Sequence, residues 1–469
     1  MRGASLKVSG MDKRFPIEDQ IEMLASALRG RVVTRKDADY DELRAVALAN
    51  FDEYPAAVIR VANAADVAAV INFAQATDLP LAIRSGGHST VGGSGVTGGI
   101  VMDLRDLNAI DIDEPTKTAW IGSGLTAGEV SAAVTARKLI IGFGDAGTVG
   151  VGGLTLGGGI GYMIRKHGLT IDNLLAAEIV TAAGDILVAD ATNHPDLFWA
   201  LRGGGGNFGV VTRFKFQLHD LPHFVGGPLV FVPTPEILAG FAAASAAAPE
   251  ELSTIGYVMP IPPVPFVPAE AHGKLAFVAM LAYSGAPEGA EAAIAPFRAL
   301  GNPLADLVAP VPYTTLYMLD PPPEAKSAVA IRSRYASQFG LAEARTMLAA
   351  MEACDAPMKM AQIRVLGGAF ARVPTDATAF AYRDANLAIA FLAMYGGGPE
   401  VTARYEAWAS EATAAIVPAN AGAYVNFLAK EGPEGLRAAY PPATLARLRK
   451  IKRAYDPGNP FRLNQNIAP

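Results

Sequence analysis

Two glycine-dense segments carry the residue types and spacing that are suited to holding an anionic ligand. The first follows a short apolar run, residues 81–83, and consists of Arg84, Ser85, Gly86, Gly87, His88 and Ser89. Paired glycines let the backbone adopt positive φ and bring its N–H groups close to a ligand, and an arginine adds a permanent positive charge. A plain glycine turn between two strands is the alternative for this pair taken alone. The chemistry indicated is diphosphate binding.

The second segment, residues 147–162, favours the ligand-binding interpretation. Its sequence is GTVGVGGLTLGGGIGY, so small residues alternate with Val, Leu and Ile. A flexible low-complexity linker is the alternative, but such linkers avoid β-branched and large apolar residues. A nearly bare backbone with apolar flanks is better suited to lying against a flat cofactor.

Bare dinucleotide patterns also occur in the chain, and their context argues against an NAD site. Residues 204–209 and 93–98 both match G-x-G-x-x-G. The Rossmann fingerprint needs a strand before the glycines and a helix after them. The first match follows an expected short helix at the start of residues 195–212 and precedes a strand, and the second precedes the expected strand 100–104. NAD is therefore not supported.

Together, the motifs RSGGHS and TVGVGGLTLGGGIGY resemble those of the FAD-linked oxidases of the vanillyl-alcohol oxidase superfamily. The order and spacing are most similar to the branch that includes berberine bridge enzyme and 6-hydroxynicotine oxidase. The segments 195–212 and 461–467 (FRLNQNI) also resemble family motifs. The resemblance implies an α+β fold, in which a two-part FAD-binding domain of the PCMH type holds an inserted α+β substrate domain whose sheet covers the flavin.

The resemblance also implies FAD as the cofactor, a small-molecule substrate and O₂ as partners, and no metal. In the family, the histidine at the place of His88 is joined through its ring to the 8α carbon of FAD. Many relatives have a second, cysteine tether, but that place is Ala146 here, so we expect a single link. The residues expected to bind FAD are Arg84, Ser85, Gly86, Gly87, His88, Ser89, Thr148, Val149, Gly152, Gly153, Gly158, Gly161, Tyr162, Val210, Asn464 and Asn466.

The catalytic end departs from the better-known members. A family Tyr-x-Asn-Tyr motif appears here as residues 424–427 with Phe427 in the last place, so that hydroxyl is absent. Leu154 and Ile160 also replace a histidine and a tyrosine of the double-tethered members, and residues 387–394 hold no acidic base. The catalytic candidates that remain are Tyr424, Gln362 and Arg364. A tyrosine is a poor base near neutral pH unless a positive group such as Arg364 adjoins it; simple packing at a domain junction is the alternative.

Three functions remain open from the sequence. The first is an oxidase that takes hydride from a carbon bearing OH or NH and passes electrons to O₂ to give H₂O₂; Val149 sits where the family is thought to control oxygen access. The second is a dehydrogenase of the same fold with another electron acceptor, and the third is a degenerate FAD-binding protein. An apolar, Pro- and Met-rich second domain and the missing base favour a small hydrophobic amine or activated alcohol.

Composition bounds the remaining possibilities. A chain of 469 residues is expected to form two domains, and a net charge of −6 gives no basic footprint for nucleic acid or an anionic membrane. One cysteine, Cys354, and a charged N-terminus without an apolar core region predict a cytoplasmic protein with no secretory signal. No pattern in the chain indicates an oligomeric state.

Three segments are expected: residues 1–221 as the N-terminal part of the FAD-binding domain, 222–422 as the substrate domain and 423–469 returning to the first. The first begins with a βαβ unit whose helix is capped by Asn63, with Asp66 in the first turn. Strands at 229–232, 275–282, 361–365 and 387–394, interspersed with helices at 235–247, 288–300, 341–353 and 399–416, predict a mixed sheet with helices on one face. An amphipathic helix is expected at 444–455.

Overall fold

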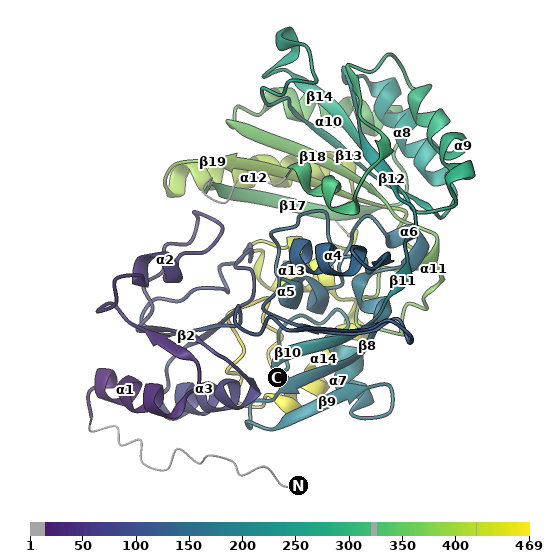
Figure 1. Cartoon of the computed structure of the whole chain (residues 1–469). Helices are drawn as coiled ribbons and strands as arrows, with labels where there is room; N and C mark the ends of the chain where they lie inside the picture. The colour runs from purple at the N-terminus through teal and green to yellow at the C-terminus, as the bar shows by residue number, and fades with distance from the viewer. Residues whose placement is uncertain (1–14, 320–325, 419) are drawn as a thin grey trace.

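The computed structural model describes residues 15–319, 326–418 and 420–469. Figure 1 shows two parts, with one large sheet and its helices in the upper part and several smaller sheets in the lower part. The C-terminal helices, drawn in yellow, lie in the lower part beside the N-terminal half of the chain. Within the described ranges, no helix is long and apolar enough to cross a membrane, and no group of three or more His, Cys, Asp or Glu side chains is arranged to hold a metal ion.

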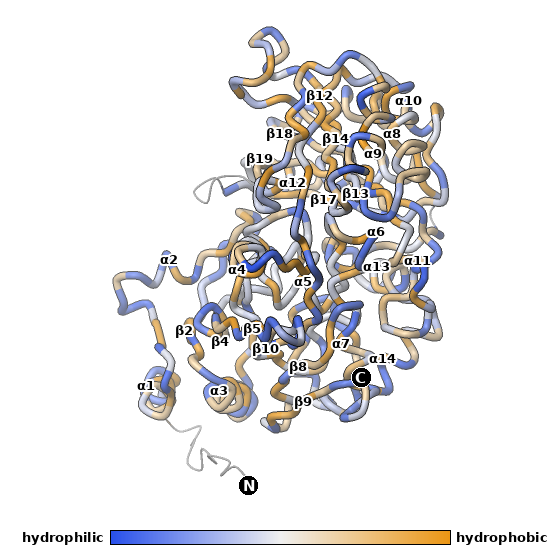
Figure 2. Tube along the Cα trace, turned by 45° about the vertical axis from the view of Figure 1, so that its right-hand side comes forward, coloured by the Kyte–Doolittle hydropathy of each residue, from blue (hydrophilic) through white to orange (hydrophobic). Residues whose placement is uncertain are grey.

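The first sheet has the strand order β1-β2-β4-β3 and contains the expected βαβ unit. Asn63 caps α3 by accepting a hydrogen bond from the Asp66 N–H, as the sequence predicts. The α3 face of Val67, Val70 and Ile71 packs on β2 and β4, and these elements are mostly hydrophobic in Figure 2. The elements of this region are α1 (Ile17–Ala27), β1 (Arg31–Val33), α2 (Tyr40–Arg44), β2 (Ala57–Arg60), α3 (Ala64–Thr77), β3 (Leu81–Arg84) and β4 (Ile100–Asp103).

A second sheet, in the order β5-β6-β10-β8-β9, completes the N-terminal region. The predicted hairpin is β8 with β9, and the predicted helix before the third glycine loop is α7. The elements are β5 (Ile110–Asp113), β6 (Thr118–Gly122), α4 (Ala127–Thr135), β7 (Leu139–Ile140), α5 (Val151–Gly157), α6 (Ile164–His167), η1 (Thr170–Asn173), β8 (Leu174–Val180), β9 (Ile186–Asp190), α7 (Pro195–Leu201), β10 (Val210–Gln217) and β11 (His219–Asp220).

The large sheet runs β15-β12-β14-β13-β18-β19-β17, with β16 paired to β12. Every strand pair in it is antiparallel, so the prediction of a mixed sheet is wrong. The sequence carries the strand and helix signals, but pairing direction depends on contacts between distant segments. Its strands are β12 (Val225–Phe231), β13 (Leu252–Pro260), β14 (Leu275–Tyr283), β15 (Ala305–Asp306), β16 (Ala309–Pro310), β17 (Ala328–Ala336), β18 (Met358–Val365) and β19 (Leu387–Tyr395).

Four helices cover one face of this sheet, as expected, and three match their predicted bounds. Alternation along each strand separates the two faces, so Ile363 of β18 faces the helices while Gln362 and Arg364 face the other way, where Arg364 reaches Asp145. The helices are α8 (Pro235–Ala247), α9 (Pro287–Arg298), α10 (Leu341–Ala353) and α12 (Pro399–Ile416); shorter elements are η2 (Ala269–Ala271), η3 (Tyr313–Leu319) and α11 (Ala369–Arg372).

The C-terminal segment packs into the same core as the second sheet. Leu445 and Leu448 of its last helix lie in the hydrophobic cluster of β6, β8 and β10. The fully buried Lys452 ammonium donates to the carbonyls of Asn207 and Phe461 and pairs with Asp456. This ties the segment to the third glycine loop. Its elements are η4 (Val425–Phe427), α13 (Gly432–Ala439) and α14 (Pro442–Tyr455).

Candidate functional site

The two glycine motifs come together in the structure. A Cβ on Gly86 would lie 2.8 Å from the Gly150 Cα, so only glycine permits the backbones to approach so closely. Ser85 Oγ donates to the Ser123 carbonyl at 2.6 Å and accepts from the Gly152 N–H at 3.3 Å. The ring of His88 makes a hydrogen bond with the Thr148 backbone. Residues separated by some sixty positions in sequence therefore form one surface.

The second glycine segment is more regular than its composition suggests. Its middle forms the seven-residue helix α5, which the glycine content of residues 147–162 does not predict. The start of the segment is fixed by α4, whose first N–H groups donate to the carbonyls of Val149 at 2.9 Å and Gly147 at 2.8 Å. Apolar side chains such as Leu154 and Leu156, buried in the core, stabilise a helix that glycine alone would disfavour.

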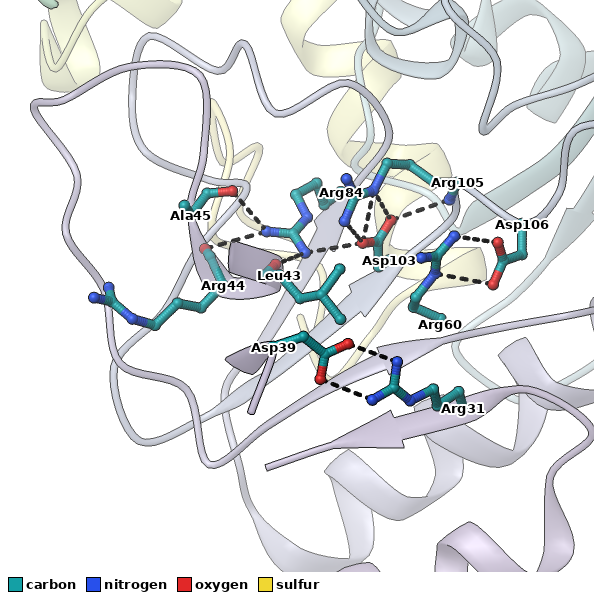
Figure 3. A network of polar contacts seen from close by, with 10 residues as sticks. All are labelled: Arg31, Asp39, Leu43, Arg44, Ala45, Arg60, Arg84, Asp103, Arg105 and Asp106. Carbon is teal, nitrogen blue, oxygen red and sulfur yellow. Dashed lines mark hydrogen bonds and ion pairs between the residues drawn. The ribbon is translucent and has the colours of Figure 1, made fainter. Parts of the chain in front are cut away.

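Arg84 has a different role from the one expected. Its guanidinium is buried, forms an ion pair with Asp103 at 2.9 Å and donates to the carbonyls of residues 43–45 (Figure 3). Asp103 also accepts from Arg105. Because Asp103 neutralises its charge, Arg84 does not present a positive charge to a diphosphate. It instead ties β3, which delivers the first glycine motif, to the preceding loop.

His88 lies half-buried at the contact between the two glycine segments. Burial lowers the pKa of its imidazole, and the hydrogen bond to the Thr148 backbone opposes that shift. The ring is therefore neutral near pH 7. A neutral imidazole that donates from one nitrogen keeps a lone pair on the other, which is the form that can act as a nucleophile or a ligand.

The third glycine loop and the C-terminus add polar groups that suit a bound nucleotide. Asn464 donates to the Gly206 carbonyl at 2.8 Å, while its own Oδ1 and that of Asn466 are buried with no hydrogen-bond partner among the described residues. Buried acceptors without partners are costly, so such atoms indicate a ligand that supplies donors. A Cβ on Gly153 would meet no atom within 4 Å, and one on Gly206 only the Asn464 amide at 3.6 Å. These open backbone faces fit the FAD expected from the sequence.

Other predicted cofactor residues have mainly packing contacts in the protein itself. Gly87 and Gly158 adopt positive φ, and Ser89 Oγ accepts from the Gly93 N–H at 3.2 Å. A Cβ on Gly161 would overlap the Phe143 carbonyl, and the Val210 side chain lies in the core of the first sheet. Their proposed contacts with FAD stay predictions.

Tyr424 is positioned at the junction between the second glycine segment and the large sheet. Its hydroxyl oxygen accepts from the Gly159 N–H and the Asn426 amide, each at 2.9 Å. Burial raises the pKa of Tyr424 despite those donors and despite the charge of Arg364. The Arg364 guanidinium instead lies over the ring of Phe427, 5.1 Å from its centroid, and Phe427 packs against Tyr424. The Tyr424 hydroxyl is therefore held by Gly159 and Asn426, and its catalytic role stays a prediction.

Arg364 belongs to a polar cluster that sequence reasoning missed. It donates to Gln362 Oε1 at 2.9 Å and to Asp145 Oδ2 at 2.7 Å. Tyr257 of β13 donates to the same Asp145 oxygen at 2.8 Å, and its hydroxyl lies 3.2 Å from that of Tyr162. The cluster joins the sheet to the segment just before the second glycine motif. A lone carboxylate at Asp145 is the sequence signal that could have indicated it.

Two segments of the chain match known protein families. Residues 55–190 match an FAD binding domain, and residues 423–468 match a berberine and berberine-like domain. The (R)-6-hydroxynicotine oxidase of Paenarthrobacter nicotinovorans is 30% identical over 94% of this chain and 97% of its own length. An uncharacterised FAD-linked oxidoreductase of Bacillus subtilis is 31% identical over 95% of this chain and all of its own length.

Solved structures share the whole fold. The 6-hydroxy-D-nicotine oxidase from Arthrobacter nicotinovorans superposes with a TM-score of 0.83 at 28% identity, covering 94% of this chain and 98% of that one. A chitooligosaccharide oxidase has the same TM-score at 22% identity, covering 96% and 99%, which shows the fold alone. The predicted α+β architecture with a PCMH-type FAD-binding part is thus confirmed.

Proposed function

Because this chain belongs to the berberine bridge enzyme-like family of FAD-linked oxidoreductases, we propose that it is an oxidase with one covalent link, between His88 and the 8α carbon of FAD. Bound FAD supplies a hydride acceptor for a substrate carbon that bears a hydroxyl or amine, and O₂ restores it with release of H₂O₂. A small organic molecule is the substrate.

The observation that carries the proposal is the position of His88. Its neutral ring lies where the two glycine segments meet, and it hydrogen-bonds to the Thr148 backbone. A lone pair on a ring nitrogen held in this way is required to form a bond to carbon. With Ala146 in place of a second tethering residue, a single link accounts for the whole attachment.

The backbone of the glycine segments would hold the cofactor's diphosphate and ring. Gly153 leaves its main chain accessible, Gly86 and Gly152 let the two segments pack closely together, and Asn464 and Asn466 offer buried acceptors. Arg84 and Asp103 act behind this surface by fixing β3. The charge of the diphosphate is then balanced by backbone N–H groups.

Acid precipitation tests the covalent link directly. We expect yellow colour and flavin fluorescence to stay with the washed pellet of the wild-type protein and to leave it in His88→Ala. His223→Ala, at an exposed histidine outside the glycine segments, is the matched control and should keep the colour in the pellet. Colour that moves to the wild-type supernatant would refute the link, and a protein that takes up no FAD would refute the whole proposal.

Reoxidation separates an oxidase from a dehydrogenase without a known substrate. We expect the dithionite-reduced protein to recover its flavin absorbance rapidly when it is mixed with air-saturated buffer in a stopped-flow instrument. The backbone carbonyl of Val149 accepts a hydrogen bond from the first turn of α4, which fixes the position of this residue. Its compact side chain supports access for O₂. Recovery that needs an added electron carrier would instead identify a dehydrogenase. A screen of amines and alcohols for peroxide release then identifies the substrate.

A further inference from the structure

Asp145 lies at the junction between the glycine segments and the large sheet. Among the residues that the structure describes, the hydrogen bonds to its carboxylate come from Arg364 and Tyr257, and both end on Oδ2. The Asp145 side chain is 19% exposed, whereas that of Arg364 is only 3% exposed. The guanidinium is therefore more deeply buried than the carboxylate, and Oδ1 is the Asp145 oxygen left to accept a hydrogen bond from a ligand.

This oxygen lies close to the place proposed for the cofactor. Asp145 precedes Thr148 by three residues, which limits the Cα separation to about 11 Å even for a fully extended chain. Thr148 is the residue whose backbone contacts His88. A carboxylate three residues from the backbone that contacts the proposed tether, His88, lies within reach of a small substrate bound beside the flavin.

The neighbouring hydroxyl groups cannot replace Asp145 as proton acceptors. Burial, together with the negative charge of Asp145, raises the pKa of both Tyr257 and Tyr162. Both therefore stay protonated near neutral pH and act as donors. Tyr424 is likewise kept neutral by burial. The acceptor in this cluster is the Asp145 carboxylate, which Arg364 and Tyr257 hold in a fixed orientation.

We propose that Oδ1 of Asp145 binds the amine or hydroxyl group of the substrate and takes its proton, so that the site accepts hydrogen-bond donors and cations and rejects carboxylates. This inference rests on the proposed function. The C–H bond of the substrate carbon breaks and its electron pair leaves as hydride to FAD, while the N–H or O–H bonding pair forms the new C=N or C=O bond. The released proton goes to Asp145, and Arg364 and Tyr257 serve as positioning residues.

Titration of the FAD-loaded protein with three probes of similar size tests the charge preference. The probes are benzylammonium, benzyl alcohol and benzoate, and binding is followed by the shift in flavin absorption and independently by calorimetry. For the wild-type protein we expect benzylammonium to bind at least about tenfold more tightly than benzoate, because the open carboxylate attracts a cation and repels an anion.

Asp145→Asn keeps an oxygen for Arg364 and Tyr257 but removes the charge. It should weaken benzylammonium by about tenfold and strengthen benzoate, since the charge of Arg364 is then no longer neutralised. Asp145→Glu keeps the charge and should retain the wild-type order. The inference is refuted if Asp145→Asn leaves the order unchanged, if benzoate binds best to the wild-type protein, or if none of the probes binds.

Asp172→Asn is the matched control for a merely structural effect. Asp172 pairs with Arg383 through both carboxylate oxygens, at 2.8 and 2.7 Å, in another ion pair between the N-terminal region and the sheet-containing region. It should lower thermal stability without changing the order of the probes. If Asp145→Asn behaves in the same way as this control, Asp145 has only a structural role.

Failure of this inference can be distinguished from failure of the proposed function. Acid precipitation of the same sample shows whether FAD is attached before any probe is added. A yellow, oxygen-reactive protein whose probe order does not depend on Asp145 would retain the proposed function and remove the role of Asp145. When the peroxide screen yields a substrate, a kcat that falls in Asp145→Asn with a changed pH profile adds a second, independent readout.

Discussion

Acidification should destabilise this protein through a stacked pair of histidines. His167 and His219 lie face to face, with ring centroids 3.9 Å apart and planes 10° apart. His219 hydrogen-bonds to Asn173 at 2.6 Å, whereas His167 Nε2 is buried and has no partner in the part of the chain that the structure describes. Burial, followed by the charges of His219 and Lys166, lowers the pKa of His167 from 6.5 to about 3. The fold therefore holds this ring in its neutral form.

The sign and size of the effect follow from proton linkage. Between the folded and unfolded pKa values, the unfolded chain binds the proton and the folded protein does not, so stability falls as pH drops below about 6.5. With a folded pKa near 3, His167 alone accounts for a loss of about 2 kcal/mol between about pH 7.5 and about pH 5. Since the side chain is only half-buried, partial access to water reduces this to about 1–2 kcal/mol.

The substitution His167→Phe isolates the contribution of His167 protonation to the pH dependence of stability. Phenylalanine can stack on His219 without titrating, and the atom it replaces makes no hydrogen bond. Urea unfolding at both pH values gives the free energy of unfolding of each protein. Between the higher and the lower pH, this free energy should fall by about 1–2 kcal/mol more in the wild-type protein than in the variant. His223→Gln, at an exposed histidine, is the control. If wild type and His167→Phe lose equal stability, the stacked neutral pair does not explain acid sensitivity.

Three further substitutions test the architecture. Gly86→Ala should separate the two glycine segments, because its Cβ would overlap the Gly150 backbone; we expect reduced FAD content, measured from the flavin-to-protein absorbance ratio. Lys452→Met leaves the buried Asp456 carboxylate unpaired, and differential scanning calorimetry should show destabilisation equivalent to about 3–5 kcal/mol. Asn63→Ala removes the α3 cap and should cost about 1 kcal/mol in urea unfolding.

Each of these three substitutions has a matched control variant. Gly396→Ala, where a Cβ meets no atom within 4 Å, should leave FAD content unchanged, and equal loss in both glycine variants would contradict the steric argument. Lys452→Met combined with Asp456→Asn should recover part of the lost stability because the unpaired charge is gone; no recovery would mean that the ion pair is not the cause. Asn63→Asp retains a capping oxygen and should remain near wild type.

Local signals in the sequence were sufficient for many elements. The capping pair Asn63 and Asp66 predicted the start of α3, and apolar spacing predicted α14 through Leu445, Leu448 and Ile451. Such features depend on residues within one or two turns of each other, so they can be read without a fold. The glycine motifs identified the family for the same reason, since their identity and spacing are local.

The strands β13 and β17 were not predicted from the sequence, and they show the limit of local sequence patterns. Residues 252–260 include Gly256, Ser253 and Thr254 and lack a clear alternation, yet they lie in the centre of the sheet because their neighbours bury them. The direction of strand pairing is decided in the same way. Neither follows from local preference, because β-strand formation depends on packing against partners that are distant in the chain.

The glycine motifs alone identified the family and its FAD cofactor, and they predict which residues hold that cofactor. How the charged side chains are used depends on the folded structure. Arg84 and Arg364 look alike in sequence as cations beside expected ligands, but Asp103 neutralises one and Asp145 the other. The distances between these partners depend on which strands pair and which faces pack together. A carboxylate such as Asp145 therefore acquires its proposed role only when the sheet is folded over the glycine segments.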